Sequence, residues 1–152
     1  MDSQIVGRIT SNLNYSRFRI SNTAISIEEE TEITLPIKTT VTNADADNYV
    51  VNEDGTIAIN KAGIYLVFAK VHGSFRTNVA GYIRLAITSM YFSSYVGNGS
   101  DISLQFQESI SGAFFITNRA LLKLSIYSMA GQINVYPSSI SPYTEIIIVK
   151  MK

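Results

Sequence analysis

The chain has 152 residues, of which 46% are hydrophobic, and its 12 basic residues balance its 12 acidic ones. This length is typical of one domain, and the hydrophobic content is enough for a real core, which argues against disorder for most of the chain. The zero net charge excludes a global field that would attract nucleic acid or anionic membranes, and the lack of cysteine excludes disulfides, thiol nucleophiles and thiolate metal sites.

The first 22 residues differ in character from the rest of the chain. They are rich in Ser and Asn, carry three arginines and have no acid after Asp2. The start lacks a basic region followed by an apolar core, so no Sec-type signal peptide is expected. We interpret residues 1–22 as an N-terminal arm that docks on a partner protein and residues 23–152 as the head domain, because three arginines are few for nucleic acid. The candidate attachment residues are Arg8, Tyr15, Arg17, Phe18 and Arg19.

Beyond the arm, β-branched and aromatic runs alternate with turn residues, and helical patterns are nearly absent. The predicted strands cover residues 32–37, 48–52, 55–60, 62–75, 82–92, 102–108, 112–117, 121–129, 132–137 and 144–152. Many short strands at regular spacing indicate an all-β antiparallel sandwich or barrel. Several runs alternate, with Leu122, Leu124 and Ile126 set against Lys123 and Ser125, so one face of these strands lies in a core.

The acidic residues and the single histidine are the candidates for chemistry. We interpret "EEETE" (28–32) as a solvated edge that prevents sheet-to-sheet aggregation. The loop that carries Asp45 and Asp47 could hold calcium, although its spacing does not match an EF-hand, and this possibility stays open. His72 alone cannot build a triad or a His-rich metal site. We therefore assign no catalytic residue, no metal ligand and no cofactor, and we predict that the protein is not an enzyme.

The stretch "AGIYLVFAKVHGSF" (62–75) is apolar on both faces. Between Ile64 and His72, Lys70 is the only permanent charge. The run is too short to cross a bilayer, which takes about 20 apolar residues as a helix, and its β-branched and aromatic residues favour a strand. A strand that is apolar on both faces must be covered on both faces.

The order of residues from Val41 to Phe68 follows the pattern V-x-N, Y-x-V, G-T-I-x-I and G-I-Y-x-x-x-F. The residues in these places are Val41, Asn43, Tyr49, Val51, Gly55, Thr56, Ile57, Ile59, Gly63, Tyr65 and Phe68. This order resembles the globular heads of the complement-q and tumour necrosis factor superfamily, and the similarity continues through "LLKLSIYS" (121–128) to the last strand. The resemblance covers residues 24–152 and implies a jelly roll that associates as a compact homotrimer.

The resemblance also implies a different role for each face of the 62–75 strand. By analogy, Tyr65 and Val67 fill the sandwich, whereas residues of the other parity face the trimer axis. The expected trimer-interface residues are Leu66, Phe68, Tyr127 and Ile147. The alternative is a monomer whose sheet is covered by the N-terminal segment or a loop.

Two classes of function remain. The first is a non-enzymatic, trimeric structural or binding protein of a bacteriophage virion: a decoration protein, a head fibre or a receptor-binding head. Its arm would dock on a capsid or other virion protein, and a host-surface glycan or protein is a further candidate partner. The alternative is a secreted or cell-surface module, located outside the cell, that recognises a protein or glycan. Neither class binds nucleic acid or inserts into a membrane.

Overall fold

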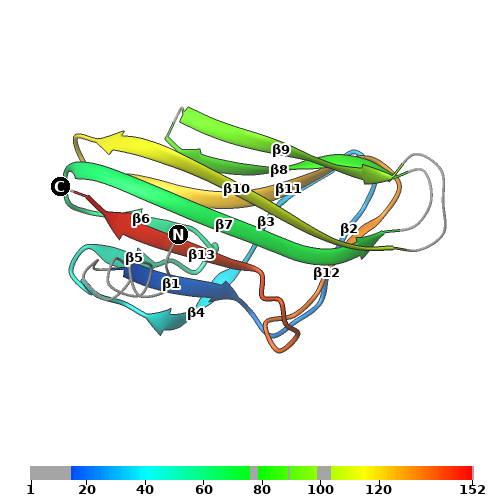
Figure 1. The fold of residues 1–152 in the computed structure, drawn as a ribbon, viewed down its shortest axis with the longest axis horizontal. Helices are drawn as coiled ribbons and strands as arrows, with labels where there is room; N and C mark the ends of the chain where they lie inside the picture. The colour runs from blue at the N-terminus through cyan, green and yellow to red at the C-terminus, as the bar shows by residue number, and fades with distance from the viewer. Residues whose placement is uncertain (1–14, 76–78, 89, 99–103, 152) are drawn as a thin grey trace, which may run out of the picture.

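The computed structural model describes residues 15–75, 79–88, 90–98 and 104–151. These residues form two antiparallel sheets that pack face to face, which confirms the predicted antiparallel β-sandwich (Figure 1). The strands are β1 (Tyr15–Ile20), β2 (Ile25–Ile27), β3 (Thr31–Thr34), β4 (Ile37–Thr42), β5 (Tyr49–Val51), β6 (Ile57–Ile59), β7 (Gly63–Phe75), β8 (Val79–Ile87), β9 (Met90–Asn98), β10 (Leu104–Ile116), β11 (Ala120–Ala130), β12 (Ile133–Val135) and β13 (Glu145–Lys150). None of the described residues forms a helix long and apolar enough to cross a membrane.

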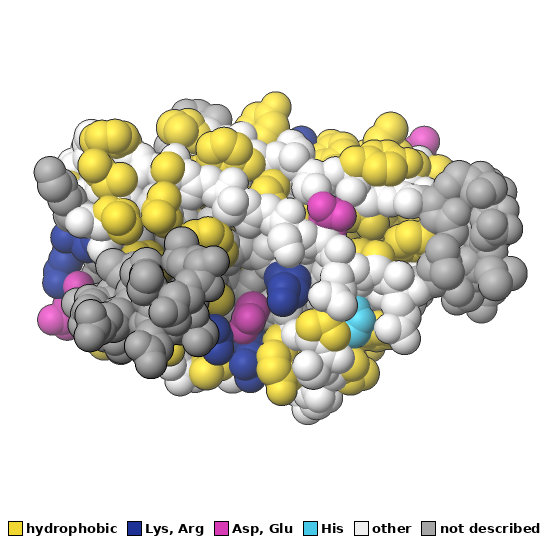
Figure 2. All heavy atoms as spheres, viewed as in Figure 1, with side chains coloured by type: hydrophobic (Ala, Val, Ile, Leu, Met, Phe, Trp, Pro, Cys, Tyr) yellow, Lys and Arg dark blue, Asp and Glu magenta, His cyan; other side chains and the backbone are white. Residues whose placement is uncertain are grey.

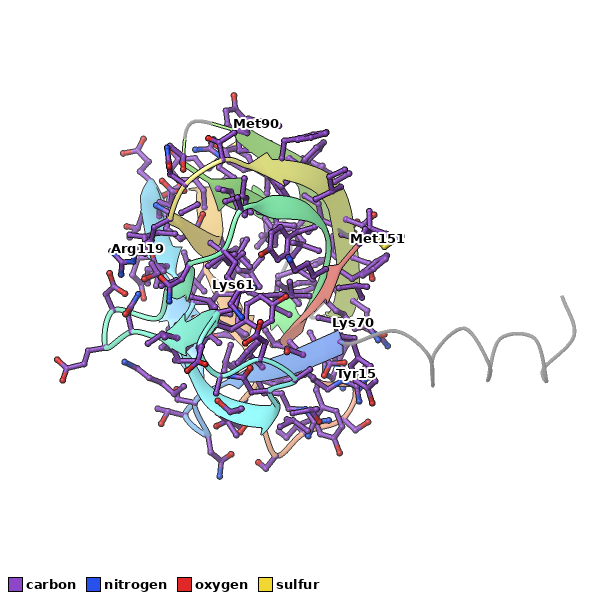
Figure 3. All side chains as sticks on the ribbon, turned by 90° about the vertical axis from the view of Figure 1, so that its left-hand side faces the viewer. Tyr15, Lys61, Lys70, Met90, Arg119 and Met151 are labelled. Atoms are coloured by element: carbon purple, nitrogen blue, oxygen red, sulfur yellow. The ribbon has the colours of Figure 1, made fainter. Side chains whose placement is uncertain are left out.

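Each sheet is built from strands that are distant in the sequence. Sheet A has the order β2-β12-β7-β13-β1-β4, with β10 on the other edge of β7. Sheet B has the order β5-β6-β11-β8-β9, with β3 also paired to β11. Figure 3 shows the two sheets from one end, with Tyr15, Lys70 and Met151 on the sheet A side and Arg119 on the opposite side.

Strand β7 is the centre of sheet A. It pairs with β10 from Gly63 to Phe75, while β13 and β12 share its other edge. Because side chains alternate along a strand, Tyr65 and Val67 point into the sandwich and are fully buried, whereas Leu66 and Phe68 point away from it. The predicted division of this strand into two faces is therefore confirmed.

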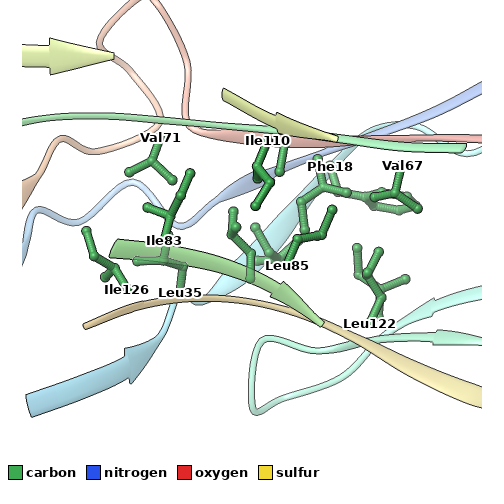
Figure 4. Packing of buried hydrophobic residues seen from close by; sticks show 14 of the residues in the cluster. Phe18, Leu35, Val67, Val71, Ile83, Leu85, Ile110, Leu122 and Ile126 are labelled. Atoms are coloured by element: carbon green, nitrogen blue, oxygen red, sulfur yellow. The ribbon is translucent and has the colours of Figure 1, made fainter. Parts of the chain in front are cut away.

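The core lies between the two sheets. In Figure 4, Val67, Val71 and Ile110 point from sheet A toward Ile83, Leu85 and Leu122 of sheet B. All six side chains are buried. Full burial of an aliphatic side chain of this kind contributes about 1.5–3 kcal/mol relative to exposure, so this layer stabilises the packing of the two sheets.

Tyr65 adds a hydrogen-bond network to the apolar core. Its hydroxyl accepts a hydrogen bond from Asn48 Nδ2 at 2.9 Å and donates one to the Lys61 carbonyl at 2.7 Å. The Oδ1 of Asn48 in turn accepts the backbone N–H groups of Asn60 and Lys61. Burial raises the pKa of Tyr65, which keeps its hydroxyl protonated as a donor. The network fixes the loop before β7 to the start of that strand.

The prediction that residues 1–22 form an arm outside the sandwich is wrong for residues 15–20. These residues form β1, which pairs with β13 on one side and β4 on the other. Phe18 and Ile20 are fully buried in the core. Within this segment, Phe18 and Ile20 alternate with Arg17 and Arg19. The arginines were interpreted as contacts to a partner, so the alternation typical of a strand was missed. Arg8 and the rest of residues 1–14 lie outside the described residues.

Four further strand predictions need correction. The run 82–92 is two strands, since the chain turns at Thr88, where φ is 54°. The runs 102–108 and 112–117 are parts of the single strand β10. Gly112 does not end this strand; it leaves room for the Phe92 ring, which lies where a side chain would be. The predicted run 32–37 is also divided, because β3 ends at Thr34 and Ile37 begins the edge strand β4, for whose residues 38–42 no strand was predicted.

Candidate functional site

The outer face of sheet A exposes an apolar surface. The antiparallel register places Leu66 beside Val149 and Ala113, and Phe68 beside Ile147. Phe68 is 45% exposed, Phe115 76% and Met151 48%, while Leu66 and Ile147 are half-buried. We call Leu66, Phe68, Phe115, Ile147 and Met151 the sheet A patch. In Figure 2, which views this face, hydrophobic atoms gather at the upper left, over the left-hand ends of β10 and β7.

Charged side chains lie next to the patch on the same face. Arg17 and Arg19 of β1 share one carboxylate, since their Nε atoms lie 3.5 and 3.4 Å from Glu145 Oε2. The Arg19 guanidinium also stacks over the Tyr143 ring at 3.7 Å. A shallow depression of about 260 Å³ lies between this cluster and the patch, lined in part by Phe68, Ile147, Lys70 and Glu145. The face thus combines an apolar centre with a polar margin, as protein interfaces do.

The edge formed by β9 and β10 is also apolar. Phe92 is 37% exposed and packs edge-on against Phe114, with ring centroids 5.4 Å apart. Met90, at the start of β9, is 49% exposed. A polar contact also joins the two strands at this edge, where the Ser94 hydroxyl donates to Glu108 Oε1 at 2.6 Å. The molecule therefore carries an apolar face and an apolar edge beside it.

Three of the four predicted interface residues lie together in the patch: Leu66, Phe68 and Ile147. Tyr127 does not join them. It lies on the outer face of sheet B, where its ring is 5.3 Å from that of Tyr82. The sequence interpretation missed Phe115 and Met151. The pair Phe114–Phe115 holds the signal for the first, because neighbouring residues of a strand cannot both point inward.

The predicted attachment residues separate in the same way. Tyr15, Arg17 and Arg19 point to the outer face of sheet A, beside Val149, Ile147 and Glu145 of β13. Phe18 is a core residue and is not accessible to a partner. Arg8 lies outside the described residues.

The predicted calcium loop is held by an ion pair. Lys61 Nζ lies 2.7 Å from Asp45 Oδ2, and this hydrogen bond lowers the pKa of the Asp45 carboxyl. Among the described residues, no group of three or more His, Asp and Glu side chains is arranged to hold a metal ion. His72 is 3% exposed and packs edge-on against Tyr136 at 4.7 Å. Asp45 and Lys61 are thus paired with each other, whereas His72 is held by packing and its buried Nδ1 has no hydrogen-bond partner among the described residues.

Comparison with known proteins agrees with this geometry. No protein-family model matches the chain, and no curated protein matches it. Among solved structures, the chain is similar to the Eiger TNF of S. frugiperda, with a TM-score of 0.64 and 12% identity over 92% of this chain and 93% of that one. It is also similar to murine APRIL, with a TM-score of 0.63 and 15% identity over 90% of this chain and 99% of that one. The chain has a tumour necrosis factor-like jelly-roll fold.

Proposed function

We propose that this protein is a non-enzymatic binding head that works as a homotrimer, with the sheet A patch as the contact between copies. The observation that carries the proposal is the apolar outer face of sheet A. A half-exposed Phe68 beside Leu66, Ile147, Phe115 and Met151 forms a continuous apolar surface, which in soluble proteins marks an interaction site.

The occupant we propose for this face is another copy of the same chain. The apolar β9–β10 edge gives each copy a second surface of matching chemistry. When one surface of a copy contacts a different surface of the next copy, the repeated rotation can return to the first copy and form a closed ring. The similarity in fold and the resemblance in sequence both support a ring of three. Every copy would then cover the patch of its neighbour.

Native mass spectrometry of the purified protein tests this proposal. The wild type should give the mass of three chains. Phe68→Asp should give folded monomers, because each interface would then bury an unpaired carboxylate. Val50→Asp is the matched control: Val50 is 43% exposed, close to the 45% of Phe68, but lies on sheet B. A monomeric wild type, or equal loss of assembly in both variants, would contradict the proposal.

For the biological setting, we propose a virion head attached to a capsid or other virion protein through the N-terminal end of the chain. Tyr15, the first described residue, pairs with Val149 near the end of β13. Attachment through the segment before Tyr15 would therefore turn the end of the sandwich that holds Tyr15 and Val149 toward the particle. The second candidate is a secreted or cell-surface module. Mass spectrometry of purified virions and of cell-surface fractions from the source separates the two settings by where the chain is found.

A further inference from the structure

A second surface lies on the opposite side of the molecule from the patch. On the outer face of sheet B, a groove of about 640 Å³ runs over the end of β8, β9 and β11. Its main lining residues are Arg84, Ala86, Tyr91, Arg119, Leu121 and Lys123. This volume is within the range of about 300–1,000 Å³ that is common for small-ligand sites.

The strand register explains why the groove exists. Lys123 of β11, Ala86 of β8 and Tyr91 of β9 stand in one row across the sheet. Ala86, in the middle of the row, has only a methyl group, while both of its neighbours have long side chains. The small residue therefore forms the floor, and Lys123 and Tyr91 form the two walls.

The groove concentrates positive charge in a protein with no net charge. Arg84, Arg119 and Lys123 all line it, and none of the described residues in the lining is an acid. Two carboxylates lie at its margin. Glu32 Oε1 is 3.8 Å from Arg84 Nη1 and also accepts a hydrogen bond from Ser125, and Asp54 Oδ1 accepts one at 2.7 Å from the hydroxyl of Thr56, which lines the groove. These two carboxylates offset part of the charge of the three cations.

Arg84 is held in place before any ligand arrives. Its guanidinium lies 4.6 Å from the centre of the Tyr91 ring and 5.2 Å from that of Tyr82. Its Nη2 also donates to the Tyr82 hydroxyl at 3.2 Å. An arginine fixed in this way loses little side-chain entropy when it binds a carboxylate through its planar fork.

We propose that this groove binds a terminal acidic sugar, that is, a sugar that carries a carboxylate, as sialic acid does. The fixed guanidinium and the Lys123 ammonium suit the carboxylate, and Tyr91 and Leu121 offer apolar walls to the C–H groups of the ring. The cations surround one depression instead of forming a track, which favours one anionic unit over a long polyanion. The inference extends the proposed binding function, but the groove lies within one chain and does not require the trimer.

Binding of 3′-sialyllactose, followed by isothermal titration, tests the inference, with lactose as the neutral control and a heparin hexasaccharide as the polyanion control. The wild type should bind sialyllactose and should bind lactose at least about tenfold more weakly, because lactose lacks the carboxylate. Equal binding of both sugars, no binding of sialyllactose, or tighter binding of heparin would overturn the proposal.

Two variants locate the site. Ala86→Phe should fill the floor of the groove and abolish binding, and Lys123→Gln should weaken it by about tenfold through loss of one charged contact. Lys70→Gln makes the same charge change on β7, at the outer face of sheet A, and should bind as the wild type does. If Ala86→Phe does not fold, Lys123→Gln still decides: unchanged affinity there overturns the proposal. Phe68→Asp should keep its affinity per chain, so loss of the trimer and loss of the groove give different results.

Discussion

The outer faces of the two sheets differ although both sheets supply the same core. On sheet A, β7 is apolar on both sides, with Tyr65 and Val67 inward and Leu66 and Phe68 outward. On sheet B, β11 buries Leu122 and Leu124, and its outward side mixes the cation Lys123 with the exposed Leu121 and Met129. Burial in the sandwich explains the inward residues of both strands. It does not explain the apolar outward residues of β7, which is why we propose a second copy of the chain as the cover of sheet A.

The largest expected effect comes from removing β1, the strand of sheet A that pairs with both β13 and β4. Deletion of residues 1–22 removes β1, leaves the edges of β13 and β4 unpaired and removes the buried Phe18 and Ile20. We expect the truncated protein to aggregate, because unpaired strand edges template association. Deletion of residues 1–14 spares β1 and is the matched control. Soluble yield and circular dichroism measure the outcome; a soluble, strand-rich product without residues 1–22 would show that β1 is dispensable.

The next effect concerns the inward side of β7. Tyr65→Ala should lower the free energy of unfolding by about 3–5 kcal/mol, out of about 5–15 kcal/mol for a whole domain. Tyr65→Phe keeps the ring but leaves the buried Asn48 side chain without its hydroxyl partner, which should cost about 1–3 kcal/mol. Urea unfolding at one fixed protein concentration measures both. Equal losses in the two variants would mean that the hydroxyl, not the ring, carries the contribution.

The smallest effect concerns the ion pair between Asp45 and Lys61. Because the bond lowers the pKa of Asp45 below its ordinary 3.8, its stabilisation is present above that pH and is lost as pH falls through the lowered value. The same bond raises the pKa of Lys61 above 10.5, so the contribution is also lost in strong alkali. Lys61→Met should therefore melt slightly below the wild type at pH 7, with the gap closing in acid. In an Asp45→Asn background, Lys61→Met should cause no pH-dependent difference in melting temperature. A difference that persists there would show that Lys61 interacts with a group other than Asp45.

Sequence reasoning predicted the sandwich from the period of two in apolar residues of several strands, and the resemblance to the tumour necrosis factor superfamily supplied the inward and outward faces of β7. It missed β1, in which Arg17 and Arg19 lie on the outward side of the strand and alternate with the buried Phe18 and Ile20. It also placed Tyr127 with Phe68, although they lie on opposite sheets. Periodicity gives the side of a strand but not the sheet to which that strand belongs, since sheet membership depends on pairing between distant residues. The groove over Ala86 was invisible for the same reason.

The most direct test of the interface uses the absence of cysteine from the chain. Phe68→Cys and Val50→Cys each introduce a single thiol at sites of similar exposure in one chain, 45% and 43%. The rate of reaction with a thiol reagent is measured for both, and sedimentation reports the assembly state of the same samples. If the sheet A patch joins the copies, the thiol at position 68 should be protected in the trimer and become reactive on dilution to monomers, whereas the thiol at position 50 should react freely throughout. Equal reactivity at both positions in an assembled sample would contradict the account.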